Sequence, residues 1–295
     1  MLKESLTKPK TSFIDVPTVS KETTHKIAIY EWNSGSSPVG TVFCVHGLTR
    51  NGRDFDVLAS KLCSDYHVYS VDIAGRGKSQ WLEDYSLYNY NSYLADIIYI
   101  INHLKLNDIH WIGTSMGGII GMMLANTSPS IIKTMTLNDI GCLVPKEGLE
   151  RILKYISEPT IFSNINKATA SLRDRTLSFG LSDEEFSVLL THSLQKTDDE
   201  KIMLTYDPNI TKSLNIADKP VEDVNLWAMW EVIKSIPTLL IRGMDSDILT
   251  HETAIGMKES HPNLTLLEIA NTGHAPALMN DNQVGSIKNF LGKNK

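Results

Sequence analysis

Short apolar runs that alternate with helical patterns are the feature that most constrains the fold of this chain. The runs are continuous or nearly continuous, as in strands covered on both faces of a parallel sheet. They occupy Thr41–Val45, Val68–Val71, Ile109–Ile112, Met135–Leu137, Thr238–Ile241 and Leu264–Ile269. The helical patterns between them lie at Asp54–Leu62, Asn91–Leu104 and Gly117–Asn126. This alternation is typical of βαβ units and predicts an α/β fold with a mostly parallel sheet.

Residues 143–235 break the alternation. They contain helix-like segments and no convincing strand. A capping box of Ser182 and Glu185 predicts the start of one of these helices. We therefore expect an α-helical insertion, or cap, over the carboxyl ends of the sheet. The predicted division is a core domain made of residues 1–142 and 236–295, with the cap at 143–235.

The clearest chemical motif is G-x-S-x-G, at Gly113 to Gly117 with Ser115 in the middle. It follows an apolar run and opens a helical pattern, which is the context that a nucleophile elbow requires. A tight strand-to-helix turn would lift the serine hydroxyl above the sheet, at a helix N-terminus that favours negative charge. The motif predicts Ser115 as a nucleophile.

A serine hydroxyl needs a base, and the base needs an acid to orient it. His274 follows the last apolar run, between a glycine and a nearby proline, and is the predicted base. Three aspartates follow neighbouring runs. We rank Asp247 first as the acid, Asp245 second and Asp139 third. Each could instead cap or tighten its own loop, and this alternative suits Asp139 best.

The backbone N–H groups of Leu48 and Met116 are the candidate oxyanion donors. Met116 follows the nucleophile, and Leu48 lies in the loop after an early strand. His46 has a position that suggests hydrogen bonding within that loop. His46, Trp227 and Trp230 are also candidate pocket residues, although aromatic side chains at helical spacing more often belong to a core.

Taken together, these motifs resemble those of the α/β-hydrolase fold superfamily over nearly the whole chain. The matching pieces are His46-Gly47, the segment from Asp72 to Ser79, the elbow, Asp247 and Gly273-His274. The resemblance implies an eight-stranded sheet with a helical cap after strand 6. It also implies a triad of Ser115, Asp247 and His274. Ala74 replaces the proline that relatives more often carry in the turn after the fourth strand.

Composition excludes several other classes. The formal net charge is −6, so the chain has no electrostatic footprint for nucleic acid. The three cysteines are odd in number and lack C-x-x-C, which argues against a disulfide framework or a thiolate zinc site. With no secretory signal and no apolar stretch long enough to span a membrane, a cytoplasmic setting is expected. Gly75 to Ser79 suggests a P-loop, but Asp72 stands where its first glycine is required. We expect no cofactor and no metal.

The sequence thus predicts a serine hydrolase that acts on a largely apolar small molecule with an acyl or carbonyl group. A carboxylic ester is the first expectation. Hydrolysis of a lactone, a thioester or the C–C bond of a diketone remains an alternative. A second class of function, ligand binding without catalysis on the same fold, also stays open.

Overall fold

The computed structural model describes residues 6–19, 22–33, 37–214 and 220–294 of the chain. Its centre is an eight-stranded sheet with the order β1-β2-β4-β3-β5-β6-β12-β13. Its first two strands are antiparallel to their neighbours, and the remaining pairs are parallel. The strands are β1 (Lys10–Pro17), β2 (Thr24–Trp32), β3 (Thr41–Val45), β4 (His67–Val71), β5 (Ile109–Thr114), β6 (Ile132–Asn138), β12 (Thr238–Gly243) and β13 (Leu264–Ile269). The predicted α/β class and mostly parallel sheet are confirmed.

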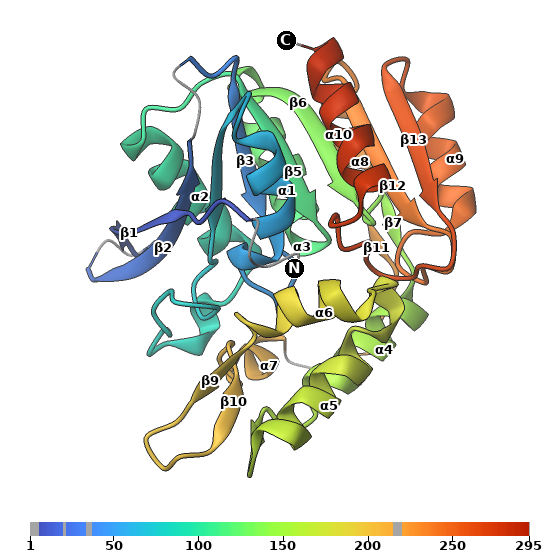
Figure 1. The fold of residues 1–295 in the computed structure, drawn as a ribbon. Coiled ribbons are helices and arrows are strands. Elements are labelled where there is room, and N and C mark those ends of the chain that lie inside the picture. The colour runs from blue at the N-terminus through green and yellow to red at the C-terminus, as the bar shows by residue number, and fades with distance from the viewer. Residues whose placement is uncertain (1–5, 20–21, 34–36, 215–219, 295) are drawn as a thin grey trace.

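Helices cover both faces of this sheet (Figure 1). One apolar core joins the sheet to α1 and α10, and a larger one joins it to the helices of the other face. The helices concerned are α1 (Asp56–Leu62), α2 (Tyr90–His103), α3 (Met116–Thr127), α8 (Trp227–Ile233), α9 (His251–Ser260) and α10 (Asp281–Lys293). The buried strands are apolar on both sides because both sides face helices.

A second layer of structure lies between β6 and β12 in the chain. We call its residues 146–213 the insertion. Figure 1 shows the insertion packed against one end of the sheet, with its helices in yellow-green and yellow. Its helices are α4 (Lys146–Ile156), α5 (Ile165–Arg175), α6 (Asp183–Leu190) and α7 (Ile210–Ser213).

The insertion is mostly helical, but it also contains short strands that the sequence analysis did not predict. β8 (Ile161–Phe162), β10 (Ile202–Leu204) and β9 (Leu194–Lys196) form a small antiparallel sheet. β7 (Leu143–Val144) pairs with β11 (Val224–Asn225). Runs of two or three residues are too short to show an alternation of period two, so no sequence pattern predicts these strands.

The end of the predicted cap also differs from the observed packing. Helix α8 packs against α3, where Asn126 Nδ2 donates to the Met229 carbonyl at 3.0 Å. α8 thus lies in the helical layer that flanks the main sheet, although it falls within the predicted range 143–235. Residues 215–219 of that range lie outside the described residues. The division into two domains stays a prediction.

Candidate active site

Ser115 occupies a strained turn between β5 and α3. Its backbone has φ 50° and ψ −114°, a conformation that residues with a side chain rarely adopt. The neighbouring Gly117 has no room for a side chain, because a Cβ there would lie 2.1 Å from the Val45 carbonyl oxygen. The predicted elbow is therefore present, and it projects Ser115 from the end of a central strand.

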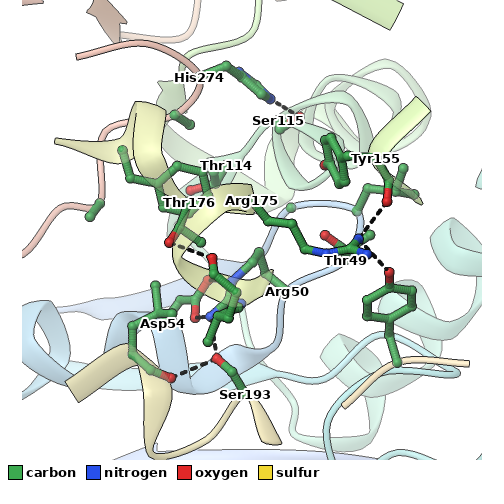
Figure 2. A pocket seen from close by; sticks show the side chains of 18 of the residues that line it. Thr49, Arg50, Asp54, Thr114, Ser115, Tyr155, Arg175, Thr176, Ser193 and His274 are labelled. Carbon is green, nitrogen blue, oxygen red and sulfur yellow. Dashed lines mark hydrogen bonds and ion pairs between the residues drawn. The ribbon is translucent and has the colours of Figure 1, made fainter. Parts of the chain in front are cut away.

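His274 lies in the loop after β13, with its ring between two oxygen atoms. Its Nε2 is 2.8 Å from Ser115 Oγ, and its Nδ1 is 2.8 Å from Asp139 Oδ2. Figure 2 shows the His274 ring reaching Ser115 at the edge of a pocket. An imidazole that donates from Nδ1 to a carboxylate has Nε2 free to accept the serine proton.

The carboxylate that His274 contacts is Asp139, and not the expected Asp247. Asp139 is fully buried at the end of β6, with φ 55°. Its Oδ1 accepts the backbone N–H of Gly243 at 2.7 Å, and its Oδ2 accepts the hydroxyl of Ser246 besides His274. These bonds aim the carboxylate at the imidazole, so this aspartate does more than cap its own loop.

Asp247 instead binds Arg151 of α4, whose Nη2 donates to its Oδ1 at 2.6 Å. Nε of Arg151 donates to the other carboxylate oxygen. Partial burial acts to raise the pKa of Asp247, but the hydrogen bond and charge of Arg151 hold it below its ordinary value. Asp245, the second-ranked candidate, is exposed.

The two candidate oxyanion donors flank the nucleophile. Met116 is the first residue of α3, and the first N–H groups of a helix have no partner within it. Leu48 lines the space above Ser115, and the Cα of Gly47 lies beside Ser115, since a Cβ there would be 3.7 Å from the serine Cβ. Their role as an oxyanion hole stays a prediction.

A buried arginine, which the sequence reasoning did not find, connects these two donors. Arg76 is fully buried, and its Nε donates to the Leu48 carbonyl at 2.9 Å. Its Nη2 contacts Met116 Sδ at 3.9 Å, and its Nη1 donates to the Tyr93 hydroxyl at 2.9 Å. Its motif, Gly-Arg-Gly, indicated a turn but nothing about where the side chain lies.

His46 has the structural role that its position suggested. Its Nε2 accepts the Ile73 N–H at 3.0 Å, so Nδ1 carries the proton that is shared with the Gly47 carbonyl at 2.6 Å. Burial lowers the pKa of His46 to about 3, which keeps the ring neutral. His46 lines neither of the two cavities beside Ser115, so its prediction as a pocket residue is wrong.

The two tryptophans are not pocket residues either. Trp230 is fully buried, its Nε1 donates to Ser260 Oγ at 3.0 Å, and its ring lies 5.0 Å from that of His261. Trp227 packs in the same helical layer and lines neither cavity. Both tryptophans therefore belong to the apolar core, and the neighbouring Met229 is the residue of α8 that lines a cavity.

Two cavities meet at Ser115. The larger has a volume of about 670 Å³ and apolar walls that include Met116, Ile119 and Met229. The smaller, about 70 Å³, is lined by His274 and by Arg50, Arg151 and Arg175. Helices α4 and α5 of the insertion contribute to its wall, so the insertion covers the nucleophile. Among the described residues there is no group of three or more histidine, cysteine or carboxylate side chains placed to hold a metal.

The comparisons with known proteins identify the family of this chain. The sequence model of the family described as alpha/beta hydrolase fold matches residues 40–281. The chain is 33% identical to a 3-hydroxybutyrate-oligomer hydrolase of Cupriavidus necator over 289 residues, which cover 96% of this chain and 98% of that protein.

Two solved structures have the same fold over nearly their whole length. A Rickettsia typhi protein assigned as a hydrolase has a TM-score of 0.87 at 34% identity, covering 97% of this chain and 99% of its own. An α/β hydrolase of Novosphingobium aromaticivorans has a TM-score of 0.86 at 27% identity, with coverage of 98% and 99%. No helix within the described residues is long and apolar enough to cross a membrane. This chain belongs to the α/β-hydrolase fold family, and it is a hydrolase.

Proposed function

We propose that the chain is a serine esterase that cleaves carboxylic esters through an acyl-enzyme, with Ser115, His274 and Asp139 as its triad. The observation that carries the proposal is the unbroken line of hydrogen bonds from Ser115 through His274 to a buried carboxylate. That arrangement allows a serine to lose its proton as it attacks a carbonyl.

In the proposed reaction, Ser115 Oγ attacks the ester carbonyl while His274 Nε2 takes the serine proton. The amides of Leu48 and Met116 stabilise the negative oxygen of the tetrahedral intermediate. The bond to the alcohol oxygen then breaks, and His274 returns its proton to that oxygen. Water, activated by the same imidazole, attacks the acyl carbon and releases the acid and free Ser115.

The substrate proposal draws on the relatives. One curated relative is named for 3-hydroxybutyrate oligomers, which are esters of a small hydroxy acid. A short oligoester of this kind suits a site that has one large apolar cavity and one small cavity with arginines in its wall. The alternatives that act on lactones, thioesters or diketones share the triad, so activity against a panel must separate them.

The test combines labelling and turnover. A fluorophosphonate probe should label the wild-type protein at Ser115, and the Ser115→Ala variant should remain unlabelled although it folds. A panel of p-nitrophenyl esters of increasing chain length, with a thioester, a lactone and a diketone beside it, measures which bond is cleaved. Absence of both labelling and ester turnover would favour ligand binding without catalysis, and faster turnover of the diketone would favour C–C hydrolysis.

A further inference from the structure

We infer that the small cavity is a subsite for the carboxylate of the leaving hydroxy acid, and that the enzyme cleaves oligoesters at their carboxyl end. The inference rests on the proposed esterase function and adds to it a direction of binding.

The proton donor decides which side of the ester lies where. The departing alcohol oxygen must receive its proton from His274 Nε2, so the leaving group lies beside that ring. Of the two cavities at Ser115, only the small one is lined by His274. The leaving group therefore enters the small cavity, and the acyl chain enters the large apolar one.

The wall of the small cavity carries three arginines, and each of them is paired with a carboxylate: Asp54, Asp247 or Glu158. Its charged lining consists of the three arginines and a single carboxylate, Asp54. Burial raises the pKa of the Tyr155 hydroxyl, and the positive charges of all three guanidinium groups oppose this rise, as does a hydrogen bond with Thr49. Figure 2 shows Arg50, Arg175 and Tyr155 around the same space, with Ser115 and His274 at its edge. A leaving group with a negative charge fits such a space better than a neutral one.

Two of these arginines keep nitrogen atoms free for a ligand. Arg50 donates from Nε and Nη2 to Asp54 at 2.8 and 2.6 Å, and from Nη2 to Ser193 at 2.9 Å. Arg151 uses the same two nitrogens for Asp247. The carboxylate partners fix both guanidinium planes, and Nη1 of each has no hydrogen bond to any described residue. Neither Nη1 is sealed in the protein, since neither belongs to the buried polar atoms without a partner.

Arg175 differs from the other two. Its Nη1 donates to the Tyr155 carbonyl at 2.6 Å and to the Tyr206 hydroxyl at 3.2 Å, and its Nη2 donates to the Pro159 carbonyl at 3.2 Å. Its carboxylate neighbour Glu158 is half exposed, 3.5 Å away. Arg175 thus holds α4 and α5 together and contributes positive charge, whereas Arg50 and Arg151 are placed to bind a carboxylate directly.

These features select one class of substrate. The leaving group of an oligoester of a short hydroxy acid is a small alcohol with its own carboxylate, if cleavage occurs at the last ester bond. Each turnover would release one hydroxy acid from the carboxyl end: Ser115 Oγ bonds to the acyl carbon, and the alcohol oxygen leaves with the proton from His274.

The test measures one ratio. The substrates are the linear dimer of 3-hydroxybutyrate and the same dimer with its terminal carboxylate replaced by a neutral carboxamide. We expect the wild-type kcat/KM to be at least about 30-fold higher for the free acid, since hydrogen bonds to charged groups are the strong ones. Arg50→Gln and Arg151→Gln should each lower that ratio about fivefold or more, and the double variant should bring it near one.

Control variants separate this subsite from general effects. Arg53→Gln removes an equivalent arginine, which pairs with Asp56 at 2.6 Å and lies over Tyr30 away from both cavities. It should leave the ratio unchanged. The pair Arg50→Gln with Asp54→Asn keeps the net charge of the cavity, so a lowered ratio there reports the lost guanidinium and not an exposed carboxylate.

Two outcomes would overturn the inference. One is a wild-type ratio near one, which requires no variant to fold. The other is a wild-type ratio that survives in the double variant. Binding provides a second measurement: 3-hydroxybutyrate should inhibit hydrolysis of p-nitrophenyl butyrate competitively and more strongly than its amide. If the wild-type protein hydrolyses neither dimer nor any p-nitrophenyl ester, the esterase function itself fails, which is a different result from a lost preference.

Discussion

Replacing Asp139 by asparagine tests the most specific statement about the site. The amide oxygen of asparagine can keep the hydrogen bond from Gly243 N–H, now 2.7 Å long, so the turn after β6 should hold. The NH₂ group would then stand where Oδ2 now accepts from His274 at 2.8 Å. Two donors would face each other unless the imidazole moves its proton to Nε2. That tautomer cannot accept the proton of Ser115.

The expected loss follows from the wrong tautomer. In other Ser-His-Asp enzymes this change costs about 10⁴ in kcat, which corresponds to about 5.4 kcal/mol of activation free energy. Stability should fall much less, by about 1–3 kcal/mol, because the hydroxyl of Ser246 can rotate to accept from the new amide. The assay is kcat/KM on p-nitrophenyl butyrate, with the rate of fluorophosphonate labelling and the thermal unfolding midpoint measured on the same samples.

Asp247→Asn and Asp245→Asn are the matched comparisons. Asp247 and Arg151 have side chains that are about two-fifths exposed, and pairs at such positions contribute about 1 kcal/mol or less. On a neutral ester both variants should stay within about threefold of wild type. If Asp139→Asn retains near-normal turnover while Asp247→Asn loses several orders of magnitude, the assignment of the acid from hydrogen bonds is refuted.

Three further predictions concern the surroundings of the triad. Gly117→Ala should lower the free energy of unfolding by about 1–3 kcal/mol and also lower kcat, because the new Cβ would clash with the Val45 carbonyl and shift the loop that carries Leu48. Urea unfolding and ester turnover measure the two effects, and an unchanged kcat would contradict the reasoning. Arg76→Met should reduce kcat about 10-fold to 100-fold with little change in KM, because it removes the hydrogen bond to the Leu48 carbonyl. Arg76→Lys should restore part of the loss, and a rise in KM alone would show that Arg76 does not position the proposed oxyanion donors. Burial lowers the pKa of His110 to about 4, whereas the same group titrates near pH 6.5 in the unfolded chain, so its contribution to stability is complete above pH 6.5 and is lost as the pH falls towards 4. The free energy of unfolding of wild type minus that of His110→Phe should therefore drop by about 3 kcal/mol over this range. A difference that does not change with pH would refute the effect.

Ser115 and His274, which lie 2.8 Å apart in the structure, could be predicted as proposed nucleophile and base because each lies in a local sequence pattern. Ser115 lies in a motif whose flanking glycines are required by the turn, and His274 follows the last strand of the sheet. The acid has no such pattern. Asp139, Asp245 and Asp247 all follow strands, and only the three-dimensional course of the loops shows which carboxylate reaches His274. The resemblance to relatives favoured Asp247, which turned out to bind the insertion.

The errors around the pocket have a similar cause. Trp227 and Trp230 recur at helical spacing, and this pattern is the same for a helix that faces a cavity and for one that faces a sheet. The burial of Arg76 and Arg50 could not be predicted, because isolated arginines in loops are usually solvated surface residues. Both are buried, Arg76 beside the candidate oxyanion donors and Arg50 in the wall of the small cavity. Such roles depend on contacts between segments far apart in the chain, which no local window contains.

The position of the acid on β6 has a consequence for how this enzyme can change. β5 and β6 are paired neighbours, with Thr114 opposite Asn138, so Ser115 and Asp139 follow facing residues of two adjacent strands. In the proposed mechanism, the loop after β12 must keep its backbone at Gly243 and the hydroxyl of Ser246, but the side chain at 247 is free of catalytic duty. The Asp247 side chain instead binds α4, through its ion pair with Arg151. An evolving lineage, or a protein engineer, could therefore change position 247 together with α4, but a new insertion would also have to replace Ser178, which donates to the His274 carbonyl at 2.8 Å.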